Sequence, residues 1–420
     1  MDRLSNKKIE DNKFLAVISE NWSEFKLQFP SFNTPHYNSS VNAMLRCGSP
    51  EFGFRQFMCL NCGNDSRIVA HSCKSKLCLR CGRVDGENFA QRVAGKLHQD
   101  MKYRHLVLTI PAQLRSYFYQ QRQDSDLLNR FFAAGWECVQ SFMSDALGQE
   151  VETGCLVVVH LVGRKCDYKP HLHVMLMSGG ISTKSGHWLW LPRHSYKLLN
   201  KIWKRVLLKM FREWDVNGEH EDIFSTLESR YKGFVANIDS RDAPGKSRDL
   251  VRYLSKYLCR PQITLKRLLN YSRNKNEVVY SYKSHLSGKT ETERINSIGF
   301  LGRILQQLLP KGFQRIRYYG LQSNQHRSRL RAMVCSALDM LDLVFERVSA
   351  PVVTTKLTYQ SLVGIWWDYD PLRCNKCGEL MDLVRVWKPK KGFIFDIFRM
   401  LFGKEIGPPG NLPSFLISSA

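Results

Sequence analysis

Two stretches near the middle of the chain carry the residue pattern of neighbouring β-strands. They are "CLVVVHLVG" (155–163) and "KPHLHVMLM" (169–177), both rich in aliphatic residues and joined by a short polar connection. Successive side chains of a strand point to opposite faces, so His171 and His173 share one face while the aliphatic residues around them share the other. The pattern predicts a hairpin that buries an apolar face. Two interpretations of the imidazoles stand: satisfied core histidines, or a pair of metal ligands on a rigid element.

The flanking segments predict further strands and helices. "YRHLVLTIP" (103–111) predicts a strand ended by Pro111, and "EVVYSYKS" predicts another. "RDLVRYLSKYL" predicts a helix. A second helix is predicted for "DSDLLNRFFAAGWECVQSFMSDAL", where one broad apolar face contains Leu127, Leu128, Phe131, Phe132 and Val139. This order of elements favours an antiparallel sheet with helices packed on it, an α+β fold.

The length of 420 residues is typical of two or three domains. We expect residues 1–100 to form an N-terminal segment with a cysteine-rich module, and residues 101–325 to form the α+β domain. Residues 326–420 are expected to form a mostly helical C-terminal region that contains a second CxxC motif.

The chain is strongly basic, with 62 Lys and Arg against 38 Asp and Glu and a net charge of +24. An excess of this size indicates a polyanionic partner, with nucleic acid favoured over an anionic membrane surface. No apolar run approaches the length of a bilayer span, and the first residues lack an apolar signal region. We therefore expect a cytoplasmic, nucleoid-associated protein with no membrane partner.

Cysteine spacing indicates metal binding. Six of the 13 cysteines fall between residues 47 and 81, and disulfide frameworks are rare in a reducing compartment. "CLNC" (59–62) and "CLRC" (78–81) are two CxxC motifs separated by 15 residues, a spacing typical of a structural zinc site. The predicted ligands are Cys59, Cys62, Cys78 and Cys81.

The ligand set stays open in two respects. Cys73 could replace one of the four thiolates, or a second ion could bind with Cys47 and His71 close by. The late pair Cys374 and Cys377 is half a site, which either borrows ligands from elsewhere or stays empty. Basic residues around the early motifs suggest a module that faces DNA, although such charges also simply solvate a surface.

A hairpin would also bring His160 beside the two histidines of the second strand, making three imidazoles on one face. Taken alone, His160 fits a satisfied core histidine better than a ligand. On the predicted helix, Tyr253 and Tyr257 are four residues apart and share a face. They are either border residues of an amphipathic helix or nucleophiles. A phenol with a pKa near 10 needs an activator, and a divalent cation on the phosphate would serve.

The order of these motifs resembles the HUH endonuclease superfamily in its two-tyrosine form. The motifs are the strand "HLVLTIP", then "PHLHVML", then "YLSKYL". The cysteine-rich "SCKSKLCLRC" before them and "LPKGFQRIRYYGLQSN" (309–324) after them make the chain similar to rolling-circle transposases of the IS-ninety-one type. The resemblance covers roughly residues 45 to 390.

The resemblance implies a five-stranded antiparallel sheet with the tyrosine helix over its metal-binding face. It implies that Tyr253 or Tyr257 attacks single-stranded DNA at an element end, leaving a 5′-phosphotyrosine link and a free 3′-hydroxyl. His171 and His173 would bind Mg²⁺ or Mn²⁺, with His160 in the place of the variable third ligand. Three neutral imidazoles favour the softer Mn²⁺.

The remaining expectations concern DNA and partners. Alternating basic and aromatic residues in "KGFQRIRYYG" suit phosphate contact and base stacking on single strands. The predicted DNA-contacting residues are Lys311, Arg315 and Arg317, with Arg252 and Lys256 on the tyrosine helix. No GxxxxGK[ST] motif occurs, so strand separation would need a host helicase or the replication machinery.

Two alternatives remain at the level of the sequence. A rolling-circle plasmid replication initiator would use the same chemistry as a transposase. A non-catalytic, zinc-dependent nucleic-acid-binding protein would explain the charge and the cysteines. It would leave the HxH and YxxxY motifs unexplained.

Overall fold

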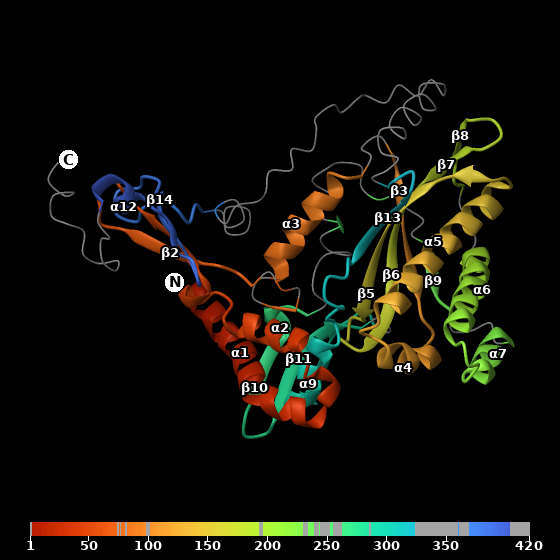
Figure 1. Cartoon of the computed structure of the whole chain (residues 1–420), viewed down its shortest axis with the longest axis horizontal. Helices are drawn as coiled ribbons and strands as arrows, with labels where there is room; N and C mark the ends of the chain where they lie inside the picture. Colours follow the sequence, from red (N-terminus) through yellow and green to blue (C-terminus); the bar gives the residue numbers. More distant parts are fainter. Residues whose placement is uncertain are drawn as a thin grey trace. The chain divides into compact units, whose positions relative to one another are not determined.

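The computed structural model describes residues 2–73, 75, 77–79, 82–97, 101–192, 196–229, 234–238, 243, 253–254, 263–284, 287–323, 360 and 369–403. The chain divides into two units (Figure 1). The first unit comprises Met1–Asn88, Thr264–Lys266 and Thr355–Ala420. The second unit comprises Phe89–Ile263 and Arg267–Thr354.

A five-stranded sheet organises the second unit, in the order β13-β5-β6-β3-β9 (Figure 1). Every neighbouring pair is antiparallel. This confirms the predicted α+β fold and the five-stranded antiparallel sheet. The bounds are β3 Tyr103–Thr109, β5 Gly154–Val162, β6 Tyr168–Met177, β9 Ala236–Ile238 and β13 Ile316–Gly320.

The two faces of this sheet are chemically different. Leu172, Val174 and Leu176 of β6 belong to a large apolar cluster that also contains residues of helices α5 and α6. The opposite face carries the histidines and a smaller cluster, which includes Met175 and Leu254. The alternation in the sequence of 169–177 therefore holds, with the imidazoles facing away from the larger core.

Helix α5, Ser125–Leu147, is the longest helix of the second unit among the described residues, and its ends have clear local causes. The Asp124 carboxylate accepts hydrogen bonds from the backbone N–H groups of Asp126 and Leu127, which satisfies donors that have no partner within the helix. Gly148 ends the helix with φ of 66°, a left-handed conformation that glycine adopts without steric cost. The helix predicted for "DSDLLNRFFAAGWECVQSFMSDAL" is confirmed.

Smaller elements complete the second unit. Two three-stranded antiparallel sheets have the orders β4-β7-β8 and β10-β11-β12. Their strands are β4 Val151–Glu152, β7 Gly179–Ser182, β8 Trp188–Trp190, β10 Leu268–Ser272, β11 Glu277–Lys283 and β12 Thr290–Asn296. The other helices bounded within the described residues are α4 Ala112–Gln120, α6 Tyr196–Trp214, α7 Glu221–Ser229 and α9 Ser297–Leu305, while α3 Gly82–Ala94 and the 3₁₀ turn η4 Leu265–Arg267 cross the unit boundary.

The first unit is assembled from both ends of the chain. Its four-stranded sheet has the order β15-β14-β1-β2, so an N-terminal hairpin pairs with a C-terminal hairpin. The strands are β1 Phe54–Met58, β2 Ser66–Ala70, β14 Asp382–Lys388 and β15 Gly392–Asp396. The helices are α1 Asp2–Gln28, α2 Pro35–Leu45, α12 Ile397–Phe402 and the 3₁₀ turns η1 Pro30–Phe32 and η2 Pro50–Phe52.

This arrangement places residues from both ends of the chain in one unit, so the module predicted for residues 1–100 also includes C-terminal strands. The described C-terminal residues 369–403 contribute two strands and one six-residue helix to it, while most of the rest of the predicted helical region 326–420 lies outside the described residues. The reason is the long-range pairing of β14 with β1. Periodicity in a sequence predicts that a strand forms, but not which strand it pairs with.

Several predicted features fall outside the described residues. Of the helix predicted for 248–258, only Tyr253 and Leu254 are described, and both are helical. Arg252, Lys256 and Tyr257 lie outside the described residues. Among the described helices, none combines the length and the apolar composition needed to cross a bilayer.

Candidate catalytic and metal sites

Three histidines converge on one face of the five-stranded sheet. His160 of β5 lies directly opposite His171 of β6 in the antiparallel register, and His173 follows two residues later. One ring nitrogen of each histidine lies within 4.8 Å of one from each of the others. The predicted hairpin is confirmed, and its three imidazoles form a group that could hold a metal ion.

The hydrogen bonds of two of these rings leave the same nitrogen available. His171 Nδ1 lies 2.7 Å from the Lys169 carbonyl oxygen, which can only accept, so Nδ1 carries the proton and Nε2 carries the lone pair. His173 Nδ1 lies 2.7 Å from Nε2 of a fourth histidine, His105. Ligating histidines typically have their second nitrogen fixed in this way.

The third ring differs, because a guanidinium N–H of Arg315 lies 3.4 Å from His160 Nε2. In His160 this contact involves Nε2, the ring nitrogen that carries the lone pair in His171. His160 is close enough to the other two rings to serve as the variable third ligand, but its Nε2 lies beside the Arg315 cation.

Burial keeps the His171 and His173 rings in the neutral form that binds metals. Burial lowers the pKa of His171 to about 4, despite the opposing hydrogen bond to the Lys169 carbonyl. Burial also lowers the pKa of His173 well below its ordinary value, with the neighbouring His160 adding to the effect. Neutral imidazoles at pH 7 can donate a lone pair to a divalent cation without first losing a proton.

A phenol reaches the same face of the sheet. The Tyr253 hydroxyl lies 2.9 Å from His105 Nδ1, and the two rings meet edge to face with centroids 5.7 Å apart. His105 in turn contacts His173. Tyr253 and the histidine group therefore lie on one side of the sheet, as the predicted site requires.

Sequence reasoning missed His105. It is on β3, in "YRHLVLTIP", where the sequence pattern indicated only a strand. The available signal was its alternation with Leu106 and Leu108, which face the larger core, so His105 had to face the other way. The order of the strands, with β3 beside β6, is what brings His105 to His173.

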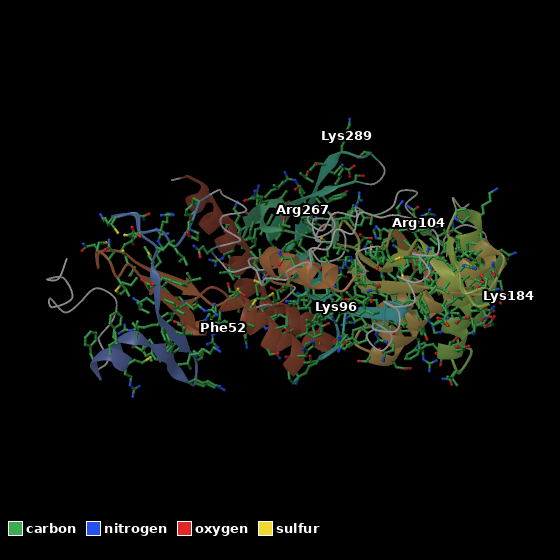
Figure 2. The ribbon with its side chains drawn as sticks, turned by 90° about the horizontal axis from the view of Figure 1, so that it is seen from above. Phe52, Lys96, Arg104, Lys184, Arg267 and Lys289 are labelled. Atoms are coloured by element: carbon green, nitrogen blue, oxygen red, sulfur yellow. The ribbon has the colours of Figure 1, made fainter. Side chains whose placement is uncertain are left out.

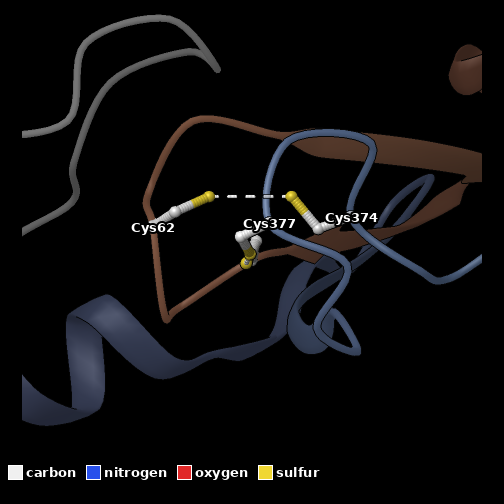
Figure 3. Close-up of side chains that lie close together, drawn as sticks. Cys62, Cys374 and Cys377 are labelled. Atoms are coloured by element: carbon white, nitrogen blue, oxygen red, sulfur yellow. Dashed lines mark hydrogen bonds between the residues drawn. The ribbon is translucent and has the colours of Figure 1, made fainter.

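Four thiols converge in the first unit, and they are not the four predicted ones. The sulfur atoms of Cys59, Cys62, Cys374 and Cys377 all lie within 4.8 Å of one another. The sulfur of Cys62 lies 3.6 Å from that of Cys374, and the pair is joined by the dashed line in Figure 3. Zinc–sulfur distances of about 2.3 Å in a tetrahedron give sulfur–sulfur separations of about 3.8 Å, so the group fits one zinc ion.

The other early cysteines form a second group. The sulfur atoms of Cys47, Cys73 and Cys78 lie within 4.8 Å of one another, and the Cys73 backbone N–H donates to the Cys47 sulfur. Cys81 lies outside the described residues. The predicted pairing of the two CxxC motifs is thus corrected. Pairing of β1 with β14 carries Cys59 and Cys62 to the late motif instead.

Two family models match the chain. The model described as "Putative transposase" matches residues 154–329, which contain β5, β6, Tyr253 and β13. The model described as "Transposase zinc-binding domain", which carries the name of the IS91 transposases, matches residues 17–110. Together with the relatives described next, these matches support an IS91-type transposase.

Two curated relatives of this transposase share most of its length. The transposase for insertion sequence element IS801 of Pseudomonas savastanoi pv. phaseolicola is 24% identical over 375 residues, covering 81% of this chain and 82% of that protein. "Putative transposase y4qJ" of Sinorhizobium fredii is 24% identical over 346 residues, covering 78% and 84%. No solved structure matches the chain.

The zinc-binding domain and the two thiol groups support structural zinc in this transposase. The Glu379 backbone N–H lowers the pKa of the Cys377 thiol to about 7, so a thiolate forms readily there at neutral pH. The matched domain ends at residue 110, yet half of the four-thiol group comes from beyond residue 370. The late CxxC motif therefore completes the site of the early one.

A cleft of about 710 Å³ opens in the second unit of the transposase. Its lining is basic and aromatic, with contributions from α3 and from the segment that leads into β13; the residues include Phe89, Arg92, Lys96, Lys311, Phe313, Arg317, Tyr318 and Tyr319. The Lys96 ammonium stands 4.9 Å from the centre of the Tyr318 ring (Lys96 is labelled in Figure 2). Two of the three predicted DNA-contacting residues near β13, Lys311 and Arg317, line this cleft.

Arg315 and Arg317 have different surroundings. The Arg317 guanidinium stacks on Phe132 and Phe313 and donates a hydrogen bond to the Asn129 side chain. The Arg315 guanidinium stands 5.7 Å from the centre of the Phe89 ring, which lines the cleft. Arg315 also contacts His160, so it lies between the cleft and the histidine group.

Proposed function

We propose that this transposase nicks single-stranded DNA at the ends of an insertion sequence and transfers the strand through a 5′-phosphotyrosine intermediate. The observation that carries the proposal is the convergence of the Tyr253 phenol with the histidine group on one face of the sheet. Family membership favours transposition over plasmid replication initiation, which would use the same chemistry.

The reaction assigns a separate task to each side chain. Tyr253 Oη forms a bond to the phosphorus, the bond from phosphorus to the 3′ oxygen breaks, the phenol proton is lost and the 3′ oxygen takes up a proton. Tyr257 is four residues further along the same sequence motif and is the candidate for the second transfer step. The free 3′-hydroxyl then reverses a linkage by attacking the phosphotyrosine.

His171 and His173 would hold the divalent cation through Nε2, with His160 as the third candidate ligand. When bound, Mn²⁺ or Mg²⁺ supplies Lewis-acid stabilisation of the charge that develops on the phosphate. The imidazole ligands favour Mn²⁺. Arg315, beside His160, is suited to contact the phosphate group, since a guanidinium can donate two parallel hydrogen bonds to two phosphate oxygens.

The cleft offers a path for the strand. Its basic side chains suit the phosphates and its partly buried aromatic rings suit the bases, a combination typical of single-strand binding. Phe89 and Arg315 connect this cleft to the histidine group. Strand separation is assigned to a host helicase or the replication machinery, since the sequence has no GxxxxGK[ST] motif.

We expect the four-thiol group to bind one structural zinc ion, and the group of Cys47, Cys73 and Cys78 to take part in a second site. A closed four-thiolate site leaves no open position for substrate, so the four-thiol group would take no part in the chemistry. The role of both groups would be to stabilise the first unit.

The experiment that tests the function is incubation of the zinc-loaded chain with labelled single-stranded oligonucleotides carrying the element ends, with Mn²⁺. A covalent protein–DNA adduct that survives denaturing electrophoresis is expected. Absence of any adduct would favour the non-catalytic zinc-dependent nucleic-acid-binding protein.

The variant His171→Asn tests the metal-ligand role of His171 in this experiment. The asparagine amide can still donate to the Lys169 carbonyl, but the Nε2 ligand is removed. We expect the adduct rate to fall by about 10²-fold or more, because the metal supplies several kcal/mol of transition-state stabilisation. DNA binding and the circular dichroism spectrum should be retained. If the spectrum collapses instead, His171 has a core role.

The cleft makes a separate prediction about binding. Replacing Lys96 and Lys311 together by alanine should weaken binding of single-stranded DNA and lower the salt slope by about 0.7 for each phosphate that is no longer neutralised. The matched control is Lys184→Ala, on the turn after β7, which Figure 2 labels well apart from Lys96. An equal change of slope in the control would show that the effect reflects overall charge and not the cleft.

A further inference from the structure

His105 joins the candidate nucleophile to a candidate metal ligand. Its Nε2 lies 2.7 Å from His173 Nδ1, and its Nδ1 lies 2.9 Å from the Tyr253 hydroxyl. The His105 ring stacks against the His173 ring at 4.9 Å and meets the Tyr253 ring edge-on. Both nitrogens of His105 are therefore used, one toward each partner, and its side chain is only 8% exposed.

Coordination of a metal ion by His173 Nε2 would fix which group donates in each hydrogen bond from His173 through His105 to Tyr253. A lone pair on His173 Nε2 is available only if Nδ1 carries the proton, so His173 Nδ1 donates to His105 Nε2. A neutral His105 then carries its own proton on Nδ1 and donates it to Tyr253 Oη. The phenol oxygen is held as an acceptor, which leaves its own O–H directed elsewhere.

We propose that His105 is a positioning residue that couples the cation site to the attacking phenol. It accepts from His173, orienting that ring for coordination, and it donates to Tyr253, orienting the oxygen that attacks the phosphorus. This inference rests on the proposed nicking reaction, and it adds a residue outside the HxH and YxxxY motifs.

The two hydrogen bonds of His105 can be removed one at a time. A glutamine amide reaches the position of imidazole Nε2, so His105→Gln keeps an acceptor for His173 and removes the hydrogen bond to Tyr253. An asparagine amide occupies the position of Nδ1, so His105→Asn keeps a donor for Tyr253 and removes the hydrogen bond to His173. Each variant is the matched control of the other.

The measurements are Mn²⁺ affinity of the zinc-loaded full chain, by electron paramagnetic resonance of free Mn²⁺, and the adduct rate at saturating Mn²⁺. His105→Asn should weaken Mn²⁺ binding by about 10- to 100-fold, because a metal ligand then lacks its outer partner, and its adduct rate at saturating Mn²⁺ should fall much less than that of His105→Gln. His105→Gln should bind Mn²⁺ as the unaltered chain does and lose about 10²-fold in adduct rate, because the phenol is misplaced.

A purely structural role would move both quantities together in both variants, and that result would overturn the proposal. Two variants that both behave like the unaltered chain would overturn it as well. If the unaltered chain gives no adduct, the proposed function fails. The Mn²⁺ measurement would then still decide whether His105 supports His173.

Discussion

Replacing Tyr253 and Tyr257 together by phenylalanine is expected to abolish the covalent protein–DNA adduct and to leave DNA binding intact. Loss of the nucleophile should lower the rate by at least about 10³-fold, as removal of other enzymatic nucleophiles does. Only the hydroxyl is removed, so the packing of the Tyr253 ring against His105 is preserved. The measurement is denaturing electrophoresis of labelled oligonucleotide after incubation with Mn²⁺.

The single variants separate the two phenols. Tyr253→Phe should lose the first nick, since its hydroxyl contacts His105 beside the histidine group. The matched control is Tyr369→Phe, whose side chain is 48% exposed in the first unit and which should cleave normally. Residual adduct in the double variant would refute the assignment of the nucleophiles.

Replacing Cys374 by serine is expected to remove one zinc ion per chain and to unfold the four-stranded sheet of the first unit. A structural zinc site contributes binding free energy on the order of 10 kcal/mol, comparable to the whole stability of a typical domain. The measurements are zinc content by plasma mass spectrometry and protease cleavage within residues 54–70.

The same experiment tests which thiols act together. Cys59→Ser, Cys374→Ser and the double variant should all retain the same zinc content, one ion below the unaltered chain, because one site is removed in each. If Cys59 bound zinc with Cys78 and Cys81 instead, Cys374→Ser would leave the zinc content unchanged. The control is Cys138→Ala, a buried thiol in the apolar core of the second unit.

Local patterns in the sequence predicted the elements that hold the candidate site. Alternation along 155–177 predicted β5, β6 and the face on which His160, His171 and His173 meet, because a strand has a fixed period of two. The predicted helix at 124–147 and the strands at 103–111 and 277–284 were also found. In each case the residue pattern that predicts the element lies within that element.

The parts that were missed depend on which elements become neighbours. His105 reaches His173 only because β3 lies beside β6, and a strand pattern carries no record of its partner. Likewise, Cys62 contacts a thiol 312 residues away, whereas the spacing between the early CxxC motifs favoured a nearby partner. The periodicity of a segment indicates which of its residues are buried. The order of the strands in a sheet depends on the whole chain and cannot be derived from one segment.

The first unit takes its strands from both ends of the polypeptide, so its sheet can assemble only after the C-terminal strands have been synthesised. Cys62 leaves the ribosome 312 residues before Cys374, which corresponds to about 15–60 s at typical rates of synthesis. Every residue of the histidine–tyrosine site precedes Cys374, so the second unit can fold while the β1–β2 hairpin still lacks its partner strand and half of its thiols. A polypeptide that ended before β14 would therefore retain the histidine group and Tyr253 but lack two strands and two thiols of the first unit.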